Sequence, residues 1–512
     1  MDKTERWVEE EIAFDPVYQE CGTEYALPDY LPDVRRVLTV RGKLMPGGQF
    51  MGGSTAEFAG VCQFCVLYAD PDGKVASLTL PVDYRYTVNM GEVGEECKYY
   101  EDSRLENVSC RLMGPRKMQL KGTVVSRVTR WTETEKEALS TDGEDLKFLE
   151  KPYTARRMFP FSTEEKSLTA TLPVSGGSDC ALLFYDGAVF VREIAQTKDG
   201  ILAMGEIRLE AVCAGEDGVP FSLFSKIPFE EVLPEEASPA SFCIGKITSL
   251  DANVSEEGDG CQLLFDIGMR LFGHTAEQSE GRLVADVFST AYPAEVTYGQ
   301  ETVWRHVKGE TKYFTLDGSV ERRDAEPSQM MTVAYTSVTH DSPKFTVEDN
   351  RLTLSANAHV SMLLSGGVGE EGVALKQQSF DYPLKMVFTL GETPPPDTKW
   401  EGTVTLSPAH GRLDQNKLFF EMEASVSVWG SVKDSYRVVE EVTLDRDRPF
   451  ENEGHQILAC YLEDGDSLWS IAKRYHTSPE SIALQNGLAE EALDHPDQPY
   501  TLDGYIRLLM TT

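Results

Sequence analysis

The residues best suited to chemistry are Cys62 and Cys65, whose Cys-x-x-Cys spacing can bind zinc or carry out thiol exchange. A zinc site of this type needs a second pair, and none lies nearby in the sequence. The flanking residues are apolar and typical of a strand, on which side chains three positions apart face opposite sides. We therefore expect buried strand cysteines, with a metal or redox site as the alternative.

Other signatures of catalysis are weak or missing. The stretch from Gly367 to Gly372 satisfies G-x-G-x-x-G, but it lies between two expected strands and carries two carboxylates where a phosphate would bind. We interpret it as a hairpin turn. The sequence contains no H-E-x-x-H, G-x-S-x-G or Walker loop, and its 8 histidines are far apart. We therefore expect a protein that is not an enzyme and that binds no cofactor.

Length and charge narrow the class of protein. A chain of 512 residues is too long for one hydrophobic core and predicts three or four domains. Its composition, 41% hydrophobic and 26% charged, is ordinary for a soluble globular protein. The 48 Lys and Arg against 84 Asp and Glu give a formal charge of -36, which repels phosphate backbones. We expect no nucleic acid partner.

The start of the chain and the cysteines indicate the compartment. Met1 to Pro16 carries acidic residues where a secretory signal has a basic and then an apolar segment, and no run of about 18 apolar residues occurs elsewhere. The 10 cysteines are scattered rather than concentrated as in small secreted domains. We expect a cytoplasmic protein with reduced thiols, no bound metal and no insertion into a membrane.

The strongest pattern is internal repetition of segments with alternating apolar residues. The segment from Arg282 to Phe288 recurs as Arg437 to Thr443, and Leu264 to Asp266 recurs in the same register as Phe419 to Glu421. Alternation with period two extends over most of the chain before the last sixty or so residues. We predict a mainly β protein with three tandem antiparallel modules that are sandwich-like or barrel-like.

Each copy contains a strand, a turn rich in glycine or acidic residues, and a second strand. The turns Asp70 to Gly73, Gly215 to Gly218 and Gly366 to Gly372 supply the positive φ that hairpins need. The flanking strands are expected at 61–68 and 75–81, at 207–212 and 221–228, and at 352–364 and 373–383.

The repeats set the predicted domain boundaries. Charged or Glu- and Pro-rich stretches at Thr132 to Lys151 and Leu233 to Pro239 are interpreted as connectors. The predicted units are an N-terminal segment at 1–24, modules at 25–135, 152–300 and 301–452, and a C-terminal domain at 455–512.

The first module carries a more specific motif. The run from Pro28 to Leu38 is followed by the turn from Tyr68 to Gly73, by Ser77 to Val82, and by Pro115 to Met118 before the last strand. This combination resembles the SPOCS domain, a β module of bacterial spore coat proteins, and implies three SPOCS modules. Turn chemistry alone also explains the prolines and aspartates of the first run, since proline fixes φ and aspartate caps the next segment.

The pattern becomes helical in the C-terminal domain. Apolar residues at i, i+3, i+4 and i+7 from Leu468 to Tyr475 predict a helix that begins after Asp466 or Ser467. A second helix is predicted within 478–487, with a serine cap, a proline at its first position and a glycine at its end. Strands are expected at 457–462 and 505–509.

This domain resembles LysM. The segment from Tyr461 to Tyr475 is similar to the family's sequence, and Asn486-Gly487-Leu488 ends the second helix as in that family. We predict a small βααβ LysM domain with Trp469 in its core. LysM domains grip N-acetylglucosamine polymers in a groove between two loops. By position, the resemblance implies a binding groove formed by Gly465, Asp466, Ser467, Leu468, Leu488 and Ala489.

The second half of the domain departs from the family. Leu502-Asp503-Gly504-Tyr505 stands where Pro-Gly-Gln is usual, after an acidic insert from Glu490 to Asp497. The segment 455–512 holds 3 basic and 9 acidic residues, which does not favour an anionic glycan. We therefore expect a protein partner in preference to peptidoglycan.

SPOCS modules followed by LysM resemble the SpoIVA-interacting spore coat morphogenesis proteins. The resemblance implies a scaffold or adaptor in the mother-cell cytoplasm that binds the coat ATPase SpoIVA at the forespore surface, with LysM as the protein-binding module. The alternative is a protein that binds N-acetylglucosamine polymers of peptidoglycan in the spore cortex or cell wall.

Overall fold

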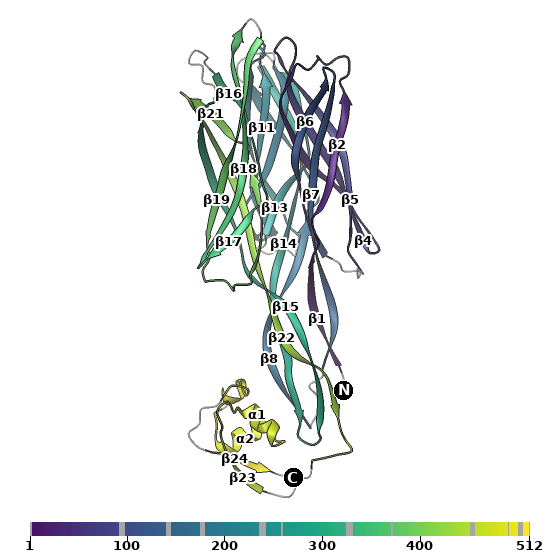
Figure 1. The fold of residues 1–512 in the computed structure, drawn as a ribbon, viewed down its shortest axis with the longest axis vertical. Helices are drawn as coiled ribbons and strands as arrows, with labels where there is room; N and C mark the ends of the chain where they lie inside the picture. The colour runs from purple at the N-terminus through teal and green to yellow at the C-terminus, as the bar shows by residue number, and fades with distance from the viewer. Residues whose placement is uncertain are drawn as a thin grey trace.

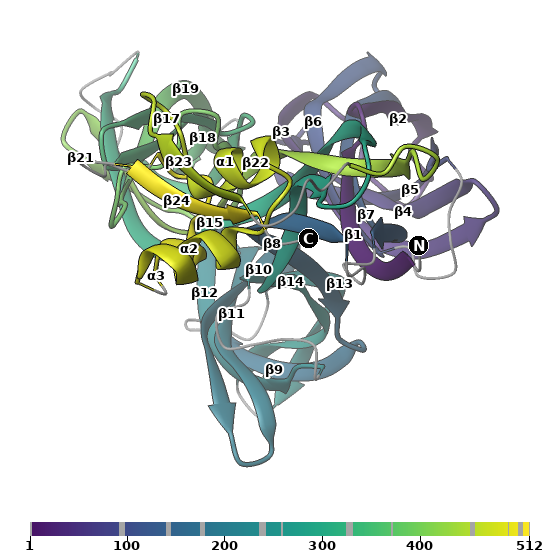
Figure 2. The same cartoon turned by 90° about the horizontal axis from the view of Figure 1, so that it is seen from below.

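The protein is described by a computed structural model, in which three β lobes surround a common axis and a small helical domain lies at one end (Figures 1 and 2). The described residues are 3–91, 98–139, 145–174, 180–234, 242–257, 260–323, 331–369, 372–450, 456–489, 491–499 and 505–510. Every strand pairing in them is antiparallel, which confirms the predicted mainly β class.

Each lobe packs two sheets around its own apolar core. The first lobe holds β1 (Lys3–Ala13), β2 (Val17–Ala26), β6 (Lys98–Gly114) and β7 (Lys117–Leu139) in one sheet and β3 (Arg36–Gly52), β4 (Thr55–Ala69) and β5 (Val75–Asn89) in the other. The second holds β8 (Leu146–Ser162), β9 (Lys166–Val174), β13 (Phe242–Glu257) and β14 (Gly260–Ser289) against β10 (Ala181–Thr197), β11 (Gly200–Ala214) and β12 (Pro220–Val232). The third holds β15 (Ala294–Glu321), β20 (Lys399–Leu406), β21 (His410–Asp414) and β22 (Lys417–Leu444) against β16 (Met331–His340), β17 (Lys344–Glu348), β18 (Arg351–Gly369) and β19 (Gly372–Thr389).

The three predicted hairpins are confirmed as β4–β5, β11–β12 and β18–β19. In the first turn, Asp70 accepts a 2.8 Å hydrogen bond from the backbone N–H of Lys74, and Gly73 has a φ of 78°. Gly218 takes the same role in the second turn, with a φ of 74°. The G-x-G-x-x-G stretch belongs to the third hairpin, as predicted, although residues 370–371 lie outside the described part of the chain.

A shared apolar cluster joins the three lobes at the axis. Leu67, Val212 and Leu363 occupy corresponding positions of the three hairpins, and all are buried in it. The strand that pairs with the other edge of each hairpin's first strand, β3, β10 or β16, has an irregular register at the matching place, between residues 37 and 39, 182 and 184, and 333 and 335. Such bulges bend a strand and turn its side chains toward a new neighbour. Here they direct residues of each lobe into the common cluster.

Cys62 and Cys65 illustrate the two faces of a hairpin strand. Cys62 is buried in the core of the first lobe, whereas Cys65 is buried in the shared cluster. The prediction that these thiols face opposite sides of a strand is therefore confirmed.

A polar contact accompanies the shared cluster. Arg41 of the first lobe pairs with Asp186 of the second at 2.9 Å and donates a 2.5 Å hydrogen bond to the Tyr335 hydroxyl of the third. Burial alone would raise the pKa of Asp186, but Lys43, at 2.8 Å, and Arg41 hold it below its usual value. Burial raises the pKa of nearby Glu210 to about 8. One guanidinium thus makes polar contacts with both other lobes.

Below the shared cluster, one long strand pair from each lobe continues toward the C-terminal domain (Figure 1). β1 pairs with the end of β7, β8 with the end of β14, and β15 with the end of β22. The connector predicted at Thr132 to Lys151 is therefore wrong, because β7 continues to Leu139 and β8 begins at Leu146. Its charged residues favoured a loop, but charge alone does not exclude a strand, because an antiparallel sheet can have one face in water.

The N-terminal segment predicted at 1–24 contributes β1 and most of β2, and both strands pair with β7 in the sheet of the first lobe. The predicted module boundaries 25–135, 152–300 and 301–452 stay predictions. They define units that should fold by themselves, and the structure of the whole chain does not test that property.

The C-terminal domain has the predicted βααβ order. It contains β23 (Gln456–Tyr461), α1 (Leu468–Arg474), α2 (Pro479–Asn486), the additional short helix α3 (Glu491–Asp494) and β24 (Tyr505–Met510). Ser467 and Ser478 cap α1 and α2, and Gly487 ends α2 with a φ of 62°. Trp469 is 6% exposed and lies in the apolar cluster of this domain, to which Leu149 and Phe288 of the second lobe also belong.

Leu67→Ala tests whether the shared cluster holds the lobes together. The change removes a side chain that is 1% exposed, and a cavity there should lower the free energy of unfolding by about 2 to 5 kcal/mol. Phe50→Ala, on the same sheet but 69% exposed, is the control and should cost less than about 0.5 kcal/mol. Denaturant titration followed by circular dichroism measures both. Equal effects of the two changes would contradict the packing described above.

Candidate functional site

The predicted groove begins in the loop before α1, where three of its four residues are buried. Gly465 is exposed with a φ of 93°. Asp466 accepts hydrogen bonds from the backbone N–H of Glu463 at 3.1 Å and from Arg474 at 2.8 Å. Ser467 caps α1, and Leu468 lies in the domain core. These side chains therefore hold the loop and the helix rather than facing an open groove.

The other side of the predicted groove is only partly open. Leu488 is half-buried and packs against the same core as Leu468, whereas Ala489 is exposed. The following loop lies directly against the start of α1. The backbone N–H of Trp469 donates to the Pro496 carbonyl at 2.8 Å, and Ser467 forms an antiparallel bridge with Pro499. The structure thus joins the two loops by backbone contacts and leaves Gly465 and Ala489 as the exposed members of the predicted set.

The C-terminal domain is docked on the second lobe through Asp286 of β14. This carboxylate accepts hydrogen bonds from Trp469 Nε1 at 2.8 Å, from Lys473 Nζ at 2.8 Å and from the Tyr298 hydroxyl at 2.6 Å. The ring of Phe288, two residues further along β14, meets the indole of Trp469 edge to face at 4.9 Å. Asp286 and Phe288 of β14 therefore anchor α1 to the long strand pair.

Contacts around this anchor widen the interface. Lys151 on β8 pairs with Asp497 at 2.8 Å, so the docked strand pair contacts the loop that borders the predicted groove. Lys147 lies 4.0 Å from Glu480 of α2. Leu149 of β8 joins the apolar core of the C-terminal domain. Part of that core is therefore supplied by the second lobe.

The environment of Asp286 favours its charged form. Burial raises its pKa, but the hydrogen bonds from Lys473, Tyr298 and Trp469 outweigh burial and hold the pKa below its usual value.

Sequence reasoning did not select Asp286 as a site residue. The signal was present, because Asp286 lies in the repeated segment from Arg282 to Phe288, yet repetition alone did not indicate which copy would contact another domain.

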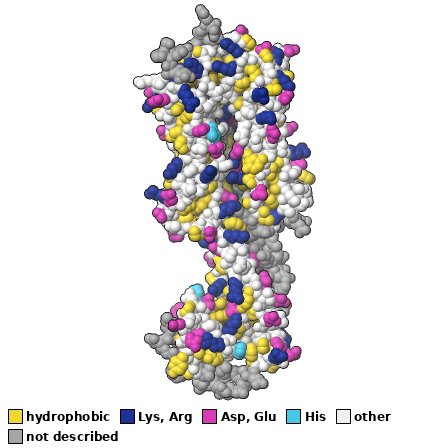
Figure 3. All heavy atoms as spheres, viewed as in Figure 1, with side chains coloured by type: hydrophobic (Ala, Val, Ile, Leu, Met, Phe, Trp, Pro, Cys, Tyr) yellow, Lys and Arg dark blue, Asp and Glu magenta, His cyan; other side chains and the backbone are white. Residues whose placement is uncertain are grey.

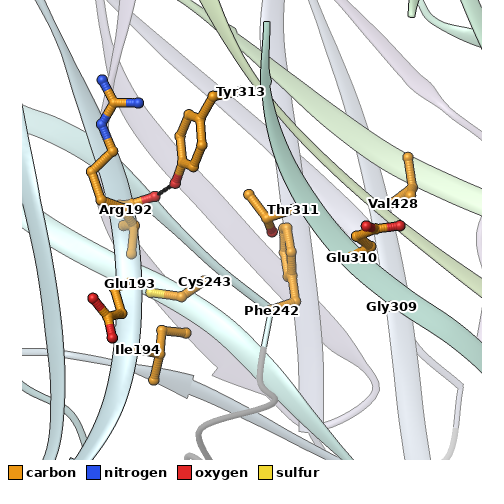
Figure 4. Close-up of a pocket in the computed structure, with 11 residues that line it drawn as sticks. Arg192, Glu193, Ile194, Phe242, Cys243, Gly309, Glu310, Thr311, Tyr313 and Val428 are labelled. Carbon is orange, nitrogen blue, oxygen red and sulfur yellow. Dashed lines mark hydrogen bonds between the residues drawn. The ribbon is translucent and has the colours of Figure 1, made fainter. Parts of the chain in front are cut away.

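The interfaces between lobes contain clefts. Their volumes are about 560 Å³ between the third and first lobes, about 380 Å³ between the first and second, and about 250 Å³ between the second and third. In the last, Arg192 lies 4.4 Å from the centroid of the Tyr313 ring, and the Tyr313 hydroxyl donates to the Val191 carbonyl (Figure 4). The largest is lined by Tyr100, Trp400 and Trp429. A ligand in any of these clefts would contact two lobes at once.

A comparison with known protein families finds that residues 463–494 match the LysM domain. The two capped helices of this segment and the βααβ order of the domain around it agree with that match. This part of the chain is a LysM domain. No curated protein and no solved structure matches the chain. The match covers α1, α2 and α3 but neither strand, so the altered closing segment that follows lies outside it.

None of the helices in the described residues is long and apolar enough to span a membrane. Within the same part of the chain, no three or more His, Cys, Asp or Glu side chains are arranged to hold a metal ion.

Asp286→Ala should release the LysM domain from the second lobe. The change removes the acceptor of the Trp469 and Lys473 hydrogen bonds, and bonds to a charged group contribute about 1.5 to 3 kcal/mol each. Hydrogen exchange of the α1 amides and Trp469 fluorescence should both report a more exposed helix. Asp266→Ala, at an exposed position of the same strand, should change neither. Unchanged α1 exchange in the Asp286 variant would show that the anchor lies elsewhere.

The same contact should depend on pH. Because the pKa of Asp286 is lowered in the folded chain, its contribution is complete above the ordinary aspartate pKa of about 3.9 and is lost as pH falls through the lowered value. Trp469 fluorescence should therefore stay constant from neutral pH to about pH 4 and change below it. Asp286→Asn should remove this transition. A transition that survives in that variant would assign it to other carboxyl groups.

Proposed function

We propose that the protein is a non-enzymatic scaffold of the SipL type in endospore coat assembly. In this role the three lobes are SPOCS modules, and the LysM domain binds a protein partner, the coat ATPase SpoIVA. The site of action would be the forespore surface, reached from the mother-cell cytoplasm. The observation that carries the proposal is the burial of Asp466, Ser467 and Leu468, which leaves little of a sugar groove.

The charge of the LysM domain also favours a protein partner. Both basic residues of α1 are already engaged, Lys473 with Asp286 and Arg474 with Asp466. Tyr461 and Leu484 are 75% and 85% exposed and offer apolar contact area outside the predicted groove. An acidic domain with exposed apolar side chains suits a partner that presents a basic and partly apolar face.

Two of the segments that carry the SPOCS resemblance, the run from Pro28 to Leu38 and the closing motif from Pro115 to Met118, meet in the first lobe. Arg116, in the closing motif, donates to the Pro28 carbonyl at 2.8 Å and to the Asp33 carboxylate at 2.5 Å. The backbone N–H of Val34 donates to the Pro115 carbonyl at 2.8 Å. These contacts support the interpretation of the prolines and aspartates as one structural unit of the module. They also favour a structural role for this segment over a binding role.

The second candidate is binding of N-acetylglucosamine polymers of peptidoglycan in the cortex or cell wall. The LysM match itself favours it, and Gly465 and Ala489 remain exposed for such contacts.

Titration of the full chain separates the two candidates. We expect binding to a SpoIVA-like ATPase that weakens as salt rises, because screening reduces attraction between an acidic domain and a basic partner. We expect no binding of chito-oligosaccharides at micromolar concentration. Leu484→Ala should weaken ATPase binding, whereas Leu264→Ala, exposed on β14 of the second lobe, is the matched control. Micromolar glycan affinity with no ATPase binding would favour the peptidoglycan candidate.

A further inference from the structure

Two thiols of the second lobe lie in direct contact. The Sγ atoms of Cys180 and Cys261 are 3.0 Å apart, closer than the ordinary contact distance of two sulfur atoms. Cys180 immediately precedes β10 in one sheet of the lobe, and Cys261 is the second residue of β14 in the other. A bond between them would therefore cross the sandwich.

A second thiol pair offers a comparison within the same chain. Cys21 on β2 and Cys62 on β4 lie in the two sheets of the first lobe, and both are buried in its core. They are 3% and 0% exposed, so an oxidant in solvent does not reach them. Cys180 is only partly buried and lies outside the strands. Each pair thus has one cysteine from each of the two sheets or their ends within one lobe, and the pairs differ in their access to solvent.

We propose that Cys180 and Cys261 are a covalent cross-link site, at which a peroxide in solution joins the two sheets of the second lobe by a disulfide. The partly exposed Cys180 thiolate attacks one peroxide oxygen, the O–O bond breaks and a water leaves, which gives a sulfenic acid. The Cys261 sulfur then attacks that sulfur and the second water leaves. In total, two thiols and one hydrogen peroxide give one disulfide and two waters.

The surroundings allow the bond but slow its formation. A disulfide needs the two sulfur atoms about 2.05 Å apart, so they must approach by about 1 Å. Cys180 can provide this movement because it forms no part of the β10 ladder. Burial, with Cys261 and Cys213 alongside, raises the pKa of Cys180 to about 12. Thiolate is therefore scarce at neutral pH, and the reaction should be slow and should accelerate as pH rises.

The cross-link would change the stability of the body and goes beyond the scaffold role proposed above. Closing a long loop reduces the freedom of the unfolded chain. The oxidised protein should therefore show a higher Tm than the reduced protein. Because Cys180 and Cys261 belong to one lobe, the bond does not require a second molecule.

The test is peptide mapping of the full chain without reductant, after treatment with hydrogen peroxide. We expect a Cys180–Cys261 cross-linked peptide, with Cys21 and Cys62 still reduced, and a Tm above that of the untreated protein. Cys180→Ser should lose the cross-link and the Tm shift, whereas Cys21→Ser should keep both. Cys180 and Cys261 that remain reduced, that are oxidised without being joined, or that pair with Cys213 instead would each overturn the proposal.

Discussion

The structure depends on the burial of one face of each hairpin against the other two lobes. Arg41 reaches from the first lobe to Asp186 of the second and Tyr335 of the third, within a cluster to which all three lobes contribute apolar side chains. A buried charge is costly unless it is paired, and the partners of Arg41 come from the other two lobes.

This association gives the LysM domain a defined position. Below the axis, the strand pairs of the second and third lobes pack on each other through residues such as Val287 and Val439. Asp286, next to Val287, then holds α1 through Trp469 and Lys473. Paired strands of the second lobe therefore lead from the axis to the LysM domain. On the face seen in Figure 3, acidic and basic side chains are interspersed over the body rather than gathered into one patch.

Local features of the structure could be predicted from sequence, and long-range ones could not. Gly73 and Ser478 mark a turn and a helix start because their effects are exerted within a few residues. Cys65 was correctly assigned to the opposite face from Cys62, but alternation does not say what covers that face. The groove residues carried over from LysM, such as Leu468, were identified by position, whereas their burial depends on the loop around Pro496 and on the rest of the core.

Whether the three lobes form one body is measured most directly by differential scanning calorimetry of the full chain. The shared cluster predicts that the lobes unfold together, with a calorimetric enthalpy close to the van't Hoff enthalpy for their transition. A small separate transition of the LysM domain would be compatible with this result. Three resolved transitions, or a calorimetric enthalpy about three times the van't Hoff value, would show that the lobes unfold independently and would contradict the central claim.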